Sequence, residues 1–174
     1  MSGDHYRCPV PAGGGVRAGD GGRLGAMLRA GACGMHADEA AVELLVAHGH
    51  WTGHGEFARR FAQVDACPDP GGVPVACIDW QAAAGGLDRG GLLACSASEA
   101  GVLRIAASLG GGVPVSLRAV LGGLDHVNIA LAARAVLHAN GTTTATVTVP
   151  APPRFPPGID VTGAGHGVRR GRGR

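Results

Sequence analysis

The sequence contains no lysine and few aromatic side chains. All 15 basic residues are arginine, and the aromatic residues are three Phe, two Trp and one Tyr. Much of the 45% apolar content is alanine and valine, which bury little area each, so any hydrophobic core should be thin. The arginine-only usage, together with the abundance of alanine and glycine, indicates a GC-rich coding sequence rather than a selected chemistry.

The sequence also lacks the signatures of disulfide scaffolds, zinc ribbons and membrane spans. Its five cysteines, at positions 8, 33, 67, 77 and 95, are odd in number and are never spaced as C-x-x-C. No uninterrupted apolar run approaches the ~20 residues that cross a bilayer. Residues 1–15 show no basic start followed by an apolar stretch. We therefore expect no signal peptide, no membrane association and a cytoplasmic location.

Charge is distributed unevenly along the chain. Residues 36–141 hold six Arg against six Asp and four Glu, a net charge of −4, whereas residues 1–35 hold four Arg against two Asp and residues 142–174 hold five Arg against one Asp. Gly and Pro, 32 and 11 in number, are frequent in both basic ends. We predict a disordered Gly-rich arm over 1–36, a helical domain over 37–141, and a Thr/Pro-rich linker with an Arg/Gly tail over 142–174. Within the first arm, Leu24 to Leu28 could form a short helix.

The clearest helical pattern lies between Cys95 and Gly141. Ser96 and Glu99 form an S-x-x-E capping box, after which apolar residues recur at helical spacing until three consecutive glycines at 110–112. Asp125 is placed to cap a last helix that ends at Asn140-Gly141.

Further start and stop signals predict additional helices. They run from Glu39 to Val46 behind a cap at Asp38, from Thr52 or Gly55 through Phe57, Phe61 and Val64, from Trp80 to Leu87 behind a cap at Asp79, and from Leu117 to Leu124. The fold class is therefore mainly α, a small helical bundle of four or five helices with disordered N- and C-terminal arms. We expect Trp51, Phe57, Phe61 and Trp80 in its core.

Two stretches favour extended structure. Val75 to Ile78 is either a connector or a strand that pairs with a distant segment, because a lone strand leaves its backbone groups without partners. Residues 142–149 alternate threonine and valine, so they form either a strand or the start of the tail.

Several sequence blocks resemble a family of short uncharacterised proteins from high-GC bacteria. The blocks are Ile78-Asp79-Trp80, residues 95–99, residues 103–109, residues 112–118 and Gly123-Leu124-Asp125. The resemblance covers roughly residues 37–141, and it implies that this region is a genuine domain whose two ends are variable additions. It implies no activity and no catalytic residue.

The densest group of metal-ligating side chains is His48, His50 and His54, with Glu56 two residues further on. Three imidazoles and a carboxylate suffice to bind zinc, and an open coordination position could activate water. The alternative is a surface connection between two helices that happens to be rich in His and Gly. The side chains converge only if the turn between Gly49 and Gly53 folds back.

Residues 116–138 have the outline of a helix-turn-helix, with glycines at 122 and 123 between a short and a longer helix. The longer helix opens with Asp125, which should repel phosphate, although Asn128 could contact adenine and Arg134 lies near its end. The predicted nucleic-acid-binding residues are Asn128, Arg134, Arg169, Arg170, Arg172 and Arg174. A plain pair of core helices and a solubilising tail are the alternatives.

No motif supports catalysis or a cofactor. Residues 13–18 fit G-x-G-x-x-A, but a dinucleotide site requires a hydrophobic strand directly before it, and Pro9 and Pro11 stand there instead. Cys95 next to a helix start is more typical of a small buried side chain than of a nucleophile. We therefore expect a non-enzymatic accessory protein that binds a protein partner, or a second copy of itself, through an exposed helical face. A DNA-associated regulator and a His-rich metal site are the alternatives.

Overall fold

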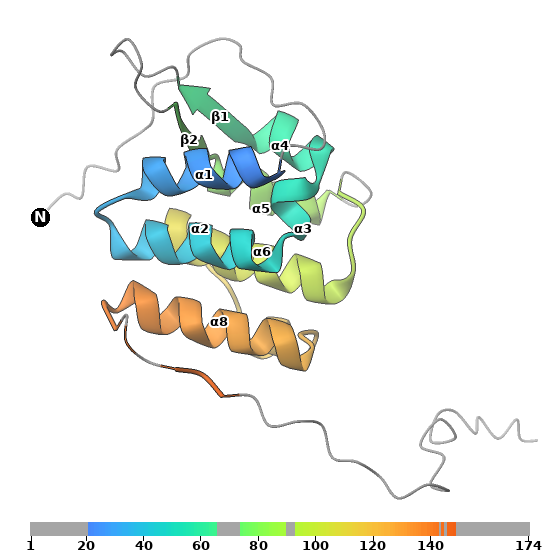
Figure 1. The fold of residues 1–174 in the computed structure, drawn as a ribbon. Coiled ribbons are helices and arrows are strands. Elements are labelled where there is room, and N and C mark those ends of the chain that lie inside the picture. The colour runs from blue at the N-terminus through green and yellow to red at the C-terminus, as the bar shows by residue number, and fades with distance from the viewer. Residues whose placement is uncertain (1–20, 66–73, 90–92, 143, 145, 149–174) are drawn as a thin grey trace, which may run out of the picture.

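The computed structural model describes residues 21–65, 74–89, 93–142, 144 and 146–148. This part of the chain folds into helices and a small two-stranded sheet (Figure 1). The elements are α1 (Gly21–Ala32), α2 (His36–His48), α3 (His50–Gly53), α4 (Gly55–Phe61), β1 (Ala62–Asp65), β2 (Val75–Ile78), α5 (Trp80–Asp88), α6 (Ala97–Gly111), α7 (Leu117–Leu121) and α8 (His126–Ala139). The predicted mainly α-helical class is confirmed, and the described residues form more helices than the four or five expected.

Helix α2 lies at the centre of the molecule and packs against α1, α6 and α8. Figure 1 shows it between α1 on one side and α8 on the other. Ala40, Ala41 and Leu45 of α2 are fully buried, and Leu44 is nearly so. Because alanine has a short side chain, neighbouring helix backbones can approach α2 closely, which compensates for the shortage of large side chains.

Helix α1 belongs to the core, so the prediction of a disordered arm over 1–36 is wrong for residues 21–36. Leu24 and Leu28 are fully buried and Met27 is almost so, at the i, i+3, i+4 spacing of one helix face. Gly31, which looks like a helix breaker in the sequence, allows close packing instead: a Cβ there would lie 2.3 Å from the carbonyl oxygen of Ala76 in β2. Residues 1–20 lie outside the described residues.

The distant partner of Val75 to Ile78 is the segment directly after α4. Strands β1 and β2 pair antiparallel, with Ala62 opposite Ile78 and Asp65 opposite Val75. Helix α4 therefore ends at Phe61, and the expectation that the same helix continues through Val64 is wrong. Of the Thr-rich segment, the described residues 142, 144 and 146–148 form neither helix nor strand.

The aromatic core is largely as predicted. Trp51, Phe57 and Phe61 are buried. The ring of Phe57 contacts the other two in tilted arrangements, with its centroid 5.2 Å from that of Trp51 and 5.6 Å from that of Phe61. The indole nitrogen of Trp51 donates to the carbonyl oxygen of Glu99, which ties α3 to α6. Trp80 is only half-buried and lies against α6, where a Cβ at Gly111 would approach it to 2.4 Å.

The local helix signals have mixed outcomes. The capping box of Ser96 and Glu99 is present, and Asp79 and Asp125 cap α5 and α8 as predicted. Asp38, however, lies inside α2, which starts at His36 without a side-chain cap. Within the described residues, no helix combines the length and apolarity needed to span a bilayer.

Candidate functional site

The three predicted histidine ligands lie close together around the short helix α3. The rings of His48 and His50 are 6.0 Å apart and those of His50 and His54 are 5.5 Å apart. Nδ1 of His50 lies 3.0 Å from the Glu99 carboxylate, and Nδ1 of His54 accepts the backbone N–H of Phe57 to cap α4. One ring nitrogen of His50 therefore links α3 to α6, and one ring nitrogen of His54 caps the helix that follows it.

Burial leaves other nitrogens of this cluster without partners. Nδ1 of His48 and Nε2 of His50 are buried and have no hydrogen-bond partner among the described residues. Burial lowers the pKa of His48, and the neighbouring His50 lowers it further, while Glu99 and Asp125 act in the opposite direction. His48 therefore favours the neutral imidazole.

Glu56 does not complete a ligand set with these histidines. Its carboxylate pairs with Arg59 and Arg60 along the exposed face of α4, and both guanidinium groups lower its pKa. The ligand atoms of His48, His50, His54 and Glu56 do not gather within 4.8 Å of one another in the described structure. The predicted four-residue metal site is thus not assembled: no three of its ligand atoms gather, and the Glu56 carboxylate is paired with Arg59 and Arg60 instead.

Asn128 does not face solvent as a base-reading side chain would. It is 8% exposed, and its side-chain amide donates to Ser98 Oγ at 2.9 Å and to the Asp125 carboxylate at 2.8 Å. Ser98 Oγ in turn donates to the same carboxylate, at 3.0 Å. These contacts join the N-termini of α6 and α8, so the predicted role of Asn128 in contacting adenine is wrong for this structure.

Arg134 remains exposed on α8, facing the region of Glu43 on α2. The remaining predicted nucleic-acid contacts, Arg169, Arg170, Arg172 and Arg174, lie outside the described residues. Among the predicted contact residues that the structure describes, Arg134 is therefore the exposed one.

A different cluster of ligating side chains forms where the N-terminus of α2 meets the C-terminus of α8. Oε2 of Glu39 lies 3.2 Å from Nε2 of His138 and 3.6 Å from Nδ1 of His36. The backbone N–H of Gly34 donates to the other carboxylate oxygen at 2.8 Å. Among the described residues, His36, Glu39 and His138 are the one group of three ligands within 4.8 Å of one another.

The electrostatics of this cluster favour an ionised carboxylate. The hydrogen bond from Gly34 holds the pKa of Glu39 below its usual value, and the bond to His138 lowers it further. Only part of this cluster could be found from the sequence. His36 and Glu39 show i, i+3 spacing on one helix, whereas His138 is 99 positions away from Glu39.

Two hollows border the seam between α2 and α8, and Glu43 and His138 line both. The larger, of about 280 Å³, also contacts Leu131 and Arg134. The smaller, of about 160 Å³, reaches Glu39 and Cys33. Arg29 donates two hydrogen bonds to the Glu43 carboxylate, at 2.5 Å and 2.9 Å, and lowers its pKa.

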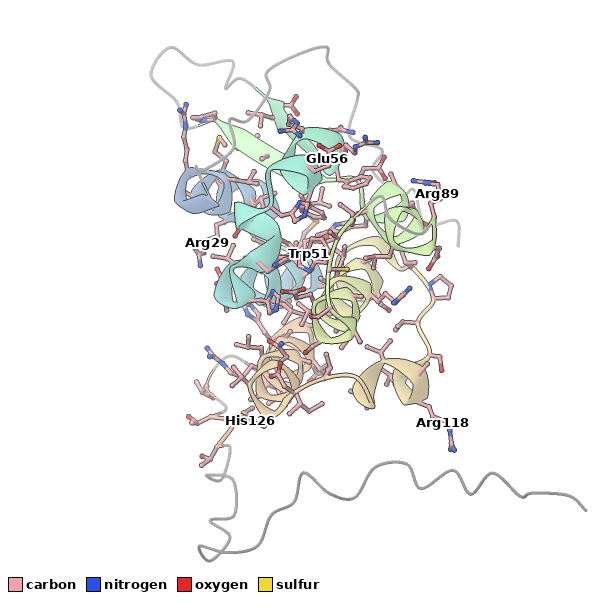
Figure 2. The ribbon with its side chains drawn as sticks, turned by 90° about the vertical axis from the view of Figure 1, so that its right-hand side faces the viewer. Arg29, Trp51, Glu56, Arg89, Arg118 and His126 are labelled. Atoms are coloured by element: carbon pink, nitrogen blue, oxygen red, sulfur yellow. The ribbon has the colours of Figure 1, made fainter. Side chains whose placement is uncertain are left out.

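Exposed apolar side chains gather on another part of the surface. The large apolar side chains that are exposed within the described structure are Met35, Leu117, Leu121, Val127, Ile129 and Val136. All except Met35 belong to α7 and α8. Figure 2 shows Arg118 of α7 and His126 of α8 on the side of the molecule away from α1 and the sheet.

Comparison of the chain with protein-family models, with curated proteins and with solved structures found no match.

Proposed function

We propose that this protein is a non-enzymatic interaction protein that associates with a second copy of itself through exposed apolar side chains of α7 and α8. The observation that carries the proposal is the concentration of such side chains on these two helices. We define the α7–α8 surface as Leu117, Leu121, Ile129 and Val136.

Helical geometry supports a continuous apolar strip on each helix. Leu117 and Leu121 stand four residues apart on α7, and Ile129 and Val136 stand seven apart on α8, so each pair shares one side of its helix. The buried residues of α8, Asn128, Ala132 and Ala135, occupy a different side. Scattered exposed apolar residues are normal, whereas exposed apolar residues aligned along one side of a helix are typical of an interaction surface.

Two features favour a second copy as the occupant. Helices α7 and α8 contain one arginine each and no carboxylate, so a two-fold pairing of this surface brings few like charges together. The core is also rich in alanine, which limits the apolar area that the single chain buries. Association would add to that area and stabilise the folded state by mass action.

A non-enzymatic role in a reducing compartment is consistent with the polar contacts and the thiols. The hydroxyl of Ser98 and the carboxylate of Asp125 bond to each other and to Asn128 at a helix junction, rather than standing in an open cleft. Cys33 and Cys95 form no disulfide within the described structure, which fits a reducing compartment.

Sedimentation of the purified full chain tests this proposal. We expect a concentration-dependent dimer at up to ~100 μM, a range in which even a weak interface is populated. The double variant Leu117→Ser/Leu121→Ser should shift the protein to monomer with unchanged circular dichroism. Met35→Ser, an equally exposed apolar residue outside α7 and α8, is the matched control and should leave the dimer intact. A monomer throughout this range would refute self-association, and a dimer that persists in the leucine variant would refute the α7–α8 surface as its interface.

A further inference from the structure

The cluster of His36, Glu39 and His138 has the composition of a transition-metal site. Two imidazoles and one carboxylate are a recurring three-ligand set for zinc, with a fourth position left to water. Calcium and magnesium prefer sites made of oxygen alone, so the two nitrogen donors favour a zinc-type ion.

The separations within the cluster match what such an ion requires. Ligand bonds of 2.0–2.1 Å in a tetrahedral arrangement place neighbouring ligand atoms about 3.3 Å apart. Oε2 of Glu39 lies 3.2 Å from Nε2 of His138 and 3.6 Å from Nδ1 of His36. One ligand atom from each of the three residues lies within 4.8 Å of the other two, so an ion would draw the two imidazoles closer together to complete the geometry.

Backbone features hold the ligands in place without an ion. The Gly34 N–H binds Oε1 of Glu39 and leaves Oε2 directed at the two histidines, which is the outer-sphere support that metal-binding carboxylates usually have. Gly141 ends α8 at φ +81° and donates its N–H to the carbonyl oxygen of His138 at 2.7 Å. The left-handed backbone of Gly141 thereby fixes the last turn of α8, which carries His138.

The cluster is also accessible. The side chain of His36 is 60% exposed, and those of Glu39 and His138 are each 28% exposed. The hollow of about 160 Å³ lies beside Glu39 and His138 and leaves room for a metal-bound water.

We propose that His36, Glu39 and His138 bind one divalent zinc-type ion, which clamps the N-terminus of α2 to the C-terminus of α8. The ion joins residues that lie about a hundred positions apart in the chain, so this three-ligand site exists only in the folded protein. Binding therefore stabilises the fold. This site is distinct from the α7–α8 surface and does not depend on dimerisation.

Calorimetric titration of the tag-free, chelator-treated full chain with Zn²⁺ tests the site. We expect one equivalent of Zn²⁺ to bind per chain and the melting temperature to rise. His36→Ala should raise the dissociation constant at least tenfold, and His138→Ala and Glu39→Gln should have a similar effect. Because His36 is mostly exposed, its variant should fold normally, which circular dichroism checks.

Three control variants separate this cluster from other donors. His126→Ala removes an exposed histidine at the start of α8, Cys33→Ser removes an exposed thiol, and His50→Ala removes a member of the other histidine cluster. All three should retain Zn²⁺ binding. Absence of binding to the wild type, unchanged binding in His36→Ala, or loss of binding in one of these controls would overturn the assignment.

Discussion

Burial of the His48 side chain makes the stability of this protein depend on pH. Its Nδ1 is buried with no hydrogen-bond partner among the described residues, and burial together with the adjacent His50 lowers its pKa. A histidine whose folded-state pKa lies below its unfolded value binds fewer protons when folded. Its contribution to stability is therefore complete above the ordinary pKa of 6.5 and is lost as the pH falls from there through the folded value.

We predict that the free energy of unfolding falls as the pH drops below about 6.5, the ordinary pKa of histidine, and that His48→Gln reduces this slope. The effect should be only a few tenths of a kcal/mol, because the imidazole is partly exposed and solvent screens its charge. Urea unfolding at several pH values measures the slope, with exposed His126→Gln as the control. Identical slopes in His48→Gln and wild type would contradict the assigned environment.

The carboxylates of Glu99 and Asp125 affect stability at lower pH than His48 does, so the two contributions can be distinguished. The hydrogen bond from the Ser96 backbone lowers the pKa of Glu99, and the N–H of Asn128 does the same for Asp125. Their contribution is present above the unfolded values, close to 4.5 and 3.8, and is lost only as the pH falls further. A loss of stability already near pH 6 therefore reports histidine.

At the scale of single elements, α1 depends on a glycine that lets it approach the sheet. A Cβ at Gly31 would lie 2.3 Å from the carbonyl oxygen of Ala76 and 3.2 Å from its carbonyl carbon, so the backbone of β2 would have to move. We predict that Gly31→Ala destabilises the protein by about 1–3 kcal/mol, as overpacking commonly does.

Gly22→Ala is the matched control on the same helix. A Cβ there meets nothing within 4 Å, and alanine favours the helical state over glycine, so stability should rise by up to ~1 kcal/mol. Urea midpoints of both variants measure the difference. Similar effects of the two substitutions would show that α1 does not pack against β2 as described.

The elements that the sequence predicted correctly are those whose signals are local. The capping box of Ser96 and Glu99 and the cap at Asp125 use residues within three positions of one another. Strand β1 was not predicted, because its partner β2 lies beyond a proline-rich segment. The spacing of Phe57 and Phe61 also fits a longer helix. The cluster of His36, Glu39 and His138 was not predicted either, because only the packing of α8 on α2 brings His138 to Glu39.

At the scale of the whole molecule, α1 completes the core, although its glycine-rich composition predicted a disordered arm. Helix α1 packs against α2, α3 and β2, and it contributes Leu24, Met27 and Leu28 to the buried interior. Glycine content suggested disorder, but three large side chains on one helix face outweigh the entropic cost of the glycines once α2 and β2 provide a surface to cover.

Truncation tests whether the domain begins at residue 21 or at residue 37. Burial of each large apolar side chain is worth about 1.5–3 kcal/mol, and a small domain is stable by only about 5–15 kcal/mol in total. We therefore predict that a fragment spanning residues 21–148 unfolds cooperatively in urea, whereas a fragment spanning 37–148 loses most of its stability and binds the dye ANS through exposed parts of α2 and β2. Equal urea midpoints for the two fragments would mean that α2 and β2 form a stable core without α1.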